Sequence, residues 1–95
     1  MPRKARLVER GLLRKGFRLT DTHHRRFVYH TLDGEEPQPV TTIMSHGADR
    51  DISDRLLGQM ARQLHLTRRQ FDNLVDCTLL QDDYEAMMRR DGFIR

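Results

Sequence analysis

Residues 17–47, FRLTDTHHRRFVYHTLDGEEPQPVTTIMSHG, decide the fold of this chain. Two runs rich in Phe, Val, Tyr, Ile and Thr flank the dipeptide Asp33-Gly34, which is typical of a turn between strands. Two prolines in the following loop delay the next strand, because proline cannot donate to an interior ladder. The pattern predicts a short antiparallel sheet. Its strands are expected over residues 17–21, 23–31 and 39–45.

Side chains of the second strand should alternate between the two faces of the sheet. Phe27 and Tyr29 share one face, and Arg26, Val28 and His30 share the other. Burying the two aromatic rings removes more apolar area from water, so we favour this choice. The open face then suits phosphate and ribose. In the alternative, Val28 points inward, and the aromatic rings form a platform on which bases can stack.

Helical patterns flank this sheet in the sequence. Apolar residues at helical spacing predict a first helix over residues 3–15, and Gly16 should end it as a C-terminal cap. Gly11 weakens the middle of this helix by about 1 kcal/mol relative to Ala, unless the backbone must approach a neighbour closely there.

Helices also follow the sheet. Asp51 should cap a second helix, and Thr67 with Gln70 makes a capping box that opens a third. The same box recurs at residues 78–81, which predicts a fourth helix with inward residues Leu80, Tyr84, Met87 and Met88. We therefore expect an α+β domain of order α-β-β-β-α, with helices on one face of the sheet. Residues 1–76 would form its core, and residues 77–95 a C-terminal helical extension.

Composition indicates a soluble globular domain. The chain has 95 residues, of which 37% are hydrophobic and 33% charged. No apolar run approaches the roughly 20 residues that span a bilayer, so we expect a cytoplasmic protein with no membrane partner. Cys77 is the only cysteine, which excludes an intrachain disulfide and a cysteine-based zinc site. We expect its thiol to be a small buried apolar group.

The basic residues are concentrated near the N-terminus. Residues 1–18 hold seven Lys or Arg and one acid, Glu9, although the whole chain carries a net charge of only +3. A basic end attracts phosphate and releases counterions on contact, so RNA is one candidate partner. A solvated surface that keeps the protein soluble is the alternative. The RNA-binding candidates in this segment are Arg3, Lys4, Arg6 and Arg10.

Four of the five histidines lie in residues 17–47, and histidine is the side chain best placed to move protons near neutral pH. Cleaving RNA without a metal needs a base for the ribose 2′-hydroxyl and an acid for the leaving oxygen. His23 or His24, opening the second strand, and His46, closing the third, should lie at the same end of the sheet. The histidine spacing does not indicate a metal site. Arg25 or Arg26 could stabilise the developing phosphate charge, and His30 could touch the ligand.

The helices around residues 51–64 and 67–76 allow a second interpretation. Two short helices with Arg68, Arg69 and Gln70 opening the second could form a helix-turn-helix. The turn glycine of that motif is absent, and His65 stands there instead. Simple antiparallel packing over the sheet is the favoured interpretation.

Three segments resemble the HicA family of toxins. They are residues 12–17 (LLRKGF), 22–27 (THHRRF) and 40–46 (VTTIMSH), and residues 56–71 are similar to the closing helix of that family. The match covers about residues 5–76. This resemblance implies a fold like that of double-stranded-RNA-binding domains and ribosome-independent, metal-independent cleavage of mRNA. It also implies neutralisation by a HicB-type antitoxin in a type II toxin–antitoxin system.

The resemblance also implies roles for individual residues. The strand-two histidine of the family falls on His23, with His24 a close second, and the histidine after strand three falls on His46. No cofactor is expected. Two other functions remain open: a non-catalytic nucleic-acid-binding or regulatory module that uses the same sheet face, and a protein-interaction domain whose exposed sheet is covered by a partner.

Overall fold

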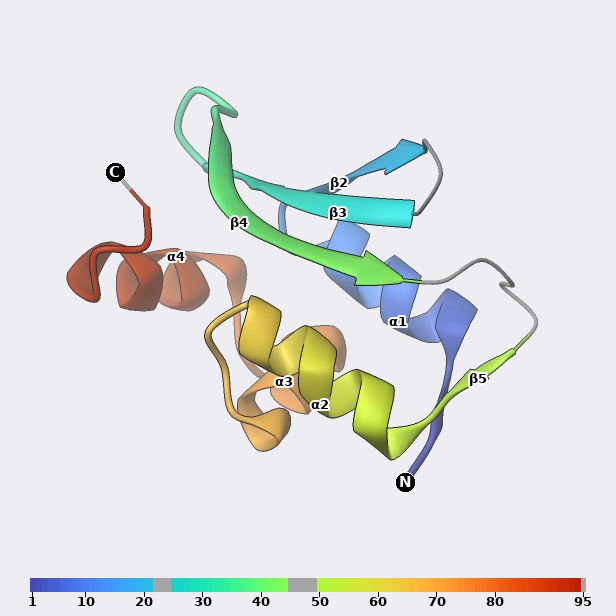
Figure 1. Ribbon diagram of the computed structural model, residues 1–95. Helices are drawn as coiled ribbons and strands as arrows, with labels where there is room; N and C mark the ends of the chain where they lie inside the picture. The colour runs from blue at the N-terminus through green and yellow to red at the C-terminus, as the bar shows by residue number, and fades with distance from the viewer. Residues whose placement is uncertain (22–24, 45–49, 95) are drawn as a thin grey trace.

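The computed structural model describes residues 1–21, 25–44 and 50–94. These residues form an α+β fold with a three-stranded antiparallel sheet, as predicted, together with four helices (Figure 1). No helix within them is long and apolar enough to cross a membrane. The helices are α1 (Ala5–Leu13), α2 (Asp54–Gln63), α3 (Arg68–Val75) and α4 (Gln81–Arg90). The strands are β1 (Arg3–Lys4), β2 (Phe17–Asp21), β3 (Arg25–His30), β4 (Pro37–Met44) and β5 (Asp51–Ile52).

The main sheet has the strand order β2-β3-β4, and both neighbouring pairs are antiparallel. The predicted strand over residues 17–21 is confirmed as β2. The start of the second predicted strand lies outside the described residues, and β3 ends at His30. β4 begins at Pro37, before the predicted start at residue 39. Proline is tolerated there because β4 lies at the edge of the sheet.

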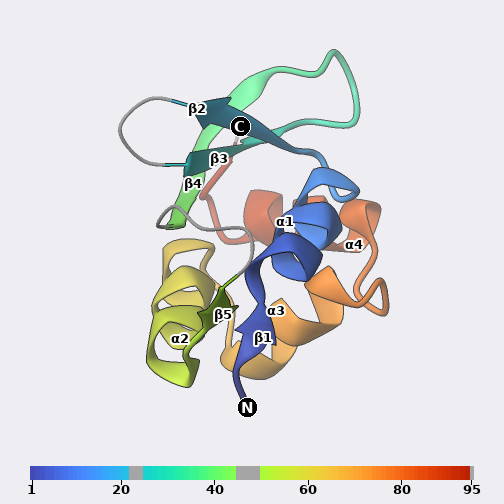
Figure 2. The same ribbon diagram turned by 90° about the vertical axis from the view of Figure 1, so that its right-hand side faces the viewer.

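The aromatic residues of β3 point into the core, as predicted. Phe27 and Tyr29 are both 0% exposed, whereas Val28 between them is only partly buried. The alternative in which these two rings form an open stacking platform is therefore wrong. All four helices lie on the side of the sheet that these rings occupy, and we call that side the covered face (Figures 1 and 2).

The C-terminal helix α4 packs on this covered face. Tyr84 from α4 joins Phe17 and Tyr29 in an aromatic cluster, with ring centroids 5.2 to 5.7 Å apart. The Tyr84 hydroxyl donates to the Leu64 carbonyl oxygen over 3.0 Å. Burial raises the pKa of Tyr84, so the hydroxyl stays protonated and remains a donor. Tyr84 and Met88 are fully buried, which confirms their predicted inward orientation.

Gly11 has the close-packing role that its position in the first helix suggested. α1 lies against α3, and a Cβ atom built on Gly11 would lie 2.5 Å from the carbonyl oxygen of Val75. Real Cβ contacts are not that short. The two helices can therefore approach this closely only because the residue has no side chain.

The N-terminal boundary differs from the prediction. The first helix begins at Ala5 rather than residue 3, because Arg3 and Lys4 pair with β5 as a small second sheet. The predicted helix cap at Asp51 is also wrong, since Asp51 belongs to β5. Ser53 caps α2 instead, and its side chain accepts from the Leu56 backbone N–H. The sequence does not show the tertiary pairing that places Asp51 in a strand.

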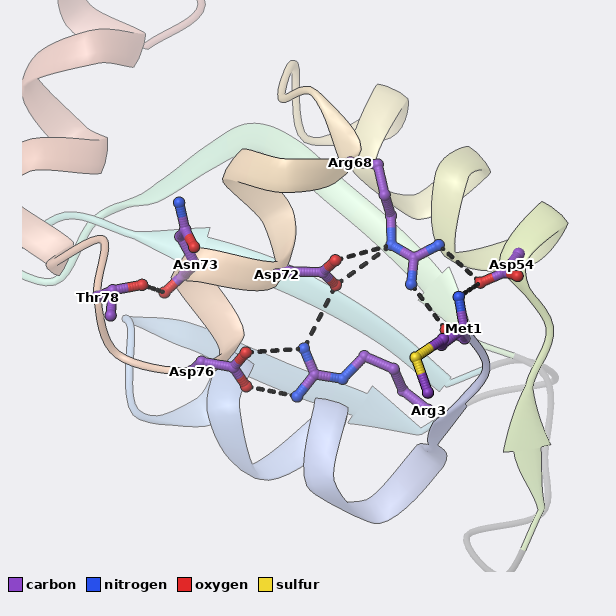
Figure 3. Close-up of polar contacts among 8 residues, drawn as sticks. All are labelled: Met1, Arg3, Asp54, Arg68, Asp72, Asn73, Asp76 and Thr78. Atoms are coloured by element: carbon purple, nitrogen blue, oxygen red, sulfur yellow. Dashed lines mark hydrogen bonds and ion pairs between the residues drawn. The ribbon is translucent and has the colours of Figure 1, made fainter.

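The two predicted capping boxes have different outcomes. The box of Thr67 and Gln70 is present at the start of α3. The second box is wrong, because the Thr78 hydroxyl donates to the Asn73 carbonyl oxygen at the end of α3 (Figure 3). Helix α4 then begins without a side-chain cap, and Leu80, predicted inward, is 51% exposed.

Cys77 is exposed, so its predicted role as a small buried apolar group is wrong. The residue lies in the turn after α3 with a φ of 71°, in the left-handed region that non-glycine residues rarely adopt. The two N–H groups that follow, on Thr78 and Leu79, both donate to the Asn73 carbonyl oxygen. This turn closes the C-terminal end of α3 and directs the side chain of Cys77 outward.

Candidate nucleic-acid interface

The three predicted catalytic histidines, His23, His24 and His46, lie outside the described residues. The strand ends that lead to them are described and are neighbours. Arg25, which follows His24 in the chain, is the antiparallel partner of Met44. His46 lies two residues after Met44 in the sequence. The chain therefore enters both histidine segments from one end of the main sheet.

The side of the main sheet opposite the helices is the candidate interface, and we call it the open face. Residues of the open face alternate with the buried ones along each strand, and they range from partly buried to exposed. The register places Arg18 beside Val28, Thr20 beside Arg26, and Val28 beside Thr41. The full set is Arg18, Thr20, Arg26, Val28, His30, Pro39, Thr41 and Ile43.

Positive and polar groups dominate the central part of the open face. The guanidinium of Arg26 is exposed and has no ion pair within the part of the chain that the structure describes. Arg18 forms a 2.6 Å ion pair with Glu35, but both side chains are more than half exposed. Nδ1 of His30 lies 2.9 Å from the Val28 carbonyl oxygen. Because that carbonyl can only accept, Nδ1 carries the proton, and Nε2 remains for a ligand.

Arg25 and Arg26 are separated by the sheet. The side chain of Arg25 is only 21% exposed and forms an ion pair with Glu9 of α1. Its Nε atom is buried and has no hydrogen-bond partner among the described residues. Of the two adjacent arginines proposed for RNA, Arg26 alone lies on the open face.

Arg3 belongs to an ion-pair network between the N-terminus and α3 (Figure 3). Its guanidinium pairs with Asp76 and with Asp72, the latter over 3.3 Å. The hydrogen bond to Asp76 raises the pKa of Arg3 above its usual value, despite an opposing effect of burial. The carboxylates of Asp72 and Asp76 neutralise the charge of Arg3. Its contacts tie the N-terminal segment to α3.

The first residue of α3, Arg68, belongs to the same network. Arg68 pairs with Asp54 at 3.1 Å and with Asp72 at 3.2 Å, and it also donates to the Met1 carbonyl oxygen over 2.9 Å. Helix α2 packs between β4 and α3. This arrangement fits simple packing over the sheet, because Arg68 is held by protein carboxylates rather than presented to a groove of DNA.

The other N-terminal bases are exposed. Lys4, Arg6 and Arg10 all face solvent. Arg6, Arg10 and Arg14, the residue that caps α1, follow one another at four-residue spacing. Arg14 lines a groove with Arg10 on one side and a hollow with Arg18 on the other. It therefore connects the basic stripe of α1 to the open face.

Sequence reasoning missed Arg14 and Arg18 as members of this interface. The signals for them were present, since Arg14 continues the four-residue spacing of Arg6 and Arg10. Arg18 occupies an outward position in the alternating strand of residues 17–21. What the sequence does not show is that the end of α1 and the start of β2 border one hollow.

The described residues contain no group of three or more His, Cys, Asp or Glu side chains that could hold a metal ion. Comparisons of this chain with protein-family models, with curated proteins and with solved structures found no match.

Proposed function

We propose that this protein is a HicA-like toxin of a type II toxin–antitoxin system, an endoribonuclease that cleaves mRNA without a metal. The observation that carries the proposal is the open face itself. It is not covered by any described helix, and it presents Arg18, Arg26 and His30. It ends where Arg25 pairs with Met44, the strand ends from which the chain continues to the proposed catalytic histidines.

The proposed chemistry uses imidazoles as base and acid. His23 or His24 removes the proton of a ribose 2′-hydroxyl, and the oxygen attacks the adjacent phosphorus. His46 donates a proton to the leaving 5′-oxygen. The products are a 2′,3′-cyclic phosphate and a free 5′-hydroxyl. Each positioned imidazole should contribute about 10²–10⁴-fold to the rate.

The order of the main elements supports a fold like that of double-stranded-RNA-binding domains. α1 is followed by the three antiparallel strands of the main sheet and then by α2, with the helices on one face. The described additions are the β1–β5 pair and the helices α3 and α4. A HicB-type antitoxin would neutralise the enzyme by covering the open face.

A non-catalytic nucleic-acid-binding or regulatory module is the second candidate function. The exposed Arg26, which has no ion pair among the described residues, favours it, because holding a phosphate backbone needs this charge but no pair of imidazoles. Such a module would retain RNA on the open face and leave it intact.

A cleavage assay separates these two functions. Purified protein is incubated with end-labelled mixed RNA in the presence of a chelator. We expect cleavage with 2′,3′-cyclic ends, and a rate lowered about 10²–10⁴-fold by His46→Ala and by substitution of the catalytic member of the pair His23 and His24. His65→Ala is the matched control. His65 follows α2 and stacks on Phe93 at a centroid distance of 3.6 Å, so it does not belong to the open face.

Two results would count against the enzyme, and a third against its proposed catalytic residues. RNA that is bound at low salt but left intact would indicate the binding module, and its affinity should fall steeply as salt rises. Absence of both binding and cleavage would favour the protein-interaction domain. Cleavage that survives substitution of all three histidines would disprove their catalytic role.

A further inference from the structure

A polar hollow lies at the end of the main sheet opposite the histidine segments. Its volume is about 270 Å³, and it lies where β2 begins and β3 ends. Four parts of the chain surround it: the C-terminal end of α1, the first residues of β2, the turn after β3 and the first residue of α4. The residues that matter for its chemistry are Arg14, Arg18, His30, Glu35 and Gln81.

Glycine at position 16 makes this arrangement possible. Gly16 has a φ of +90°, and a Cβ atom built on it would lie 2.2 Å from Nε2 of Gln81. The missing side chain lets Gln81 close one wall of the hollow. Nε2 of Gln81 donates to the Tyr29 hydroxyl over 3.4 Å, which fixes the orientation of the amide. The C-terminal helix, which lies beyond the segment resembling the HicA family, therefore completes the hollow.

Two guanidinium groups reach the hollow from different elements. Arg14 is exposed and has no ion pair within the described segments of the chain. Arg18 is paired with Glu35, with side chains 53% and 72% exposed, and such exposed pairs contribute little free energy. His30 also lines this wall, and with the proton on Nδ1 its Nε2 can accept a hydrogen bond from a ribose hydroxyl beside the phosphate.

We propose that this hollow is a phosphate-binding subsite for single-stranded RNA that lies along the open face. Planar guanidinium groups match phosphate oxygens in a bidentate way, and two of them at one hollow can grip a single phosphate group. Arg18 and His30 are residues of both the open face and the hollow, so a strand on that face leads into it. This inference rests on the proposed function.

The position of the hollow defines which part of the RNA it holds. His30 ends β3 and Arg25 begins it, so the hollow and the histidine end are separated by roughly 17 Å of strand. The phosphate in the hollow therefore belongs to a different nucleotide from the one whose bond is cleaved. The subsite anchors the flanking strand and makes binding depend on RNA length.

Glu35 acts as a competitor in this arrangement. A phosphate group that enters the hollow must replace the Glu35 carboxylate on Arg18. Removing that carboxylate should strengthen RNA binding, whereas removing the neighbouring Glu36 carboxylate should not have the same effect. Glu36 is also exposed and has the same charge, but its side chain makes no contact with Arg18 among the described interactions.

The test measures affinity for a labelled 2′-O-methyl RNA of twelve nucleotides, which lacks the nucleophile and stays intact. We expect Arg14→Ala to weaken binding about fivefold to tenfold, and the control Arg69→Ala, on α3, by less than about twofold. Glu35→Gln should strengthen binding about threefold more than Glu36→Gln does. A trinucleotide should show no difference between wild type and Arg14→Ala when it occupies only the histidine end.

Different failures lead to different conclusions. If Arg14→Ala behaves like Arg69→Ala while Arg26→Glu weakens binding, the subsite is overturned and the open-face proposal stands. If wild-type protein binds no RNA, the proposed function and the subsite both fall. Titration with inorganic phosphate, followed by NMR of the arginine Nε–H groups, tests whether the hollow is a site for free phosphate rather than for RNA. Shifts at Arg14 and Arg18 without any effect of Arg14→Ala on RNA affinity would indicate a site for free phosphate and overturn the RNA subsite.

Discussion

The two faces of the main sheet are made by alternate residues of the same three strands, yet they differ in almost every property. The covered face holds Phe17, Phe27 and Tyr29, which are at most 1% exposed. The open face holds Arg18, Arg26 and partly buried groups. An antiparallel sheet can carry one face toward solvent because its strands are joined by short turns and need no crossover helices on both faces. The comparison therefore separates residues that maintain the fold from residues that are available to a ligand.

Substitution of neighbours in β3 should give the largest difference between the faces. Phe27→Ala leaves a cavity in the covered face and should lower the free energy of unfolding by about 3–5 kcal/mol. Val28→Ala, one residue away on the open face, should cost less than about 1 kcal/mol. Urea denaturation at pH 7 measures both. Equal losses would mean that the two faces are not distinct in packing.

Glu85 should make the attachment of α4 to the covered face depend on pH. Its carboxylate accepts from the Tyr29 hydroxyl over 2.8 Å and the Leu32 N–H over 2.9 Å, and it pairs with Arg89 at 2.9 Å. Burial alone would raise its pKa, but the bonds from Leu32, Tyr29 and Arg89 outweigh burial and lower the pKa below its usual value. A lowered pKa means stabilisation that is present above the unfolded-state pKa and is lost as pH falls through the folded-state pKa.

The corresponding variant is Glu85→Gln, which keeps the shape and removes the charge. It should cost about 1–3 kcal/mol at pH 7. This difference from wild type should shrink as the pH is lowered below the usual range of a glutamate. Urea denaturation at pH 7 and at pH 3 gives the comparison, with the exposed Glu36→Gln as control. A cost that does not change with pH would disprove the titration of Glu85.

A pair of glycines tests how tightly the helices pack beneath the covered face. Alanine at Gly11 would meet the Val75 carbonyl, so Gly11→Ala should destabilise the fold by about 1–3 kcal/mol. Alanine at Gly58 meets only the end of the Arg62 side chain, at 4.0 Å, so Gly58→Ala should stabilise it by about 0.5–1 kcal/mol. Thermal unfolding should show shifts of opposite sign. Shifts of the same sign would contradict close packing of α1 on α3.

The sequence predicted the features that local pattern controls. Alternation along β3 placed Phe27 and Tyr29 inward, and the box of Thr67 and Gln70 correctly located the start of α3. The buried apolar area decides the orientation of the two rings, and hydrogen bonds within four residues decide where α3 starts. Both depend little on distant parts of the chain.

The wrong predictions involve contacts outside the local pattern on which each prediction was based. Asp51 was a good cap in sequence, but it pairs with Lys4 in the small sheet. Thr78 was part of a good capping box, but its hydroxyl closes the end of α3 at Asn73. Strand alternation already places Arg25 and Arg26 on opposite faces, but the ion pair of Arg25 with Glu9 depends on the placement of α1 beneath the sheet. The strand pattern therefore predicts which residues lie on the open face. Which of its charges are neutralised by ion pairs depends on tertiary contacts.

The central claim is that RNA binds the open face, and charge reversal on that face tests it most directly. Arg26→Glu and Arg69→Glu make the same change of charge on the open face and on α3. The measurement is the affinity of each variant for labelled 2′-O-methyl RNA at low salt, by fluorescence anisotropy. We predict that Arg26→Glu weakens binding about tenfold, while Arg69→Glu weakens it less than about threefold. Equal losses for the two variants, or an unchanged affinity for Arg26→Glu, would contradict the account.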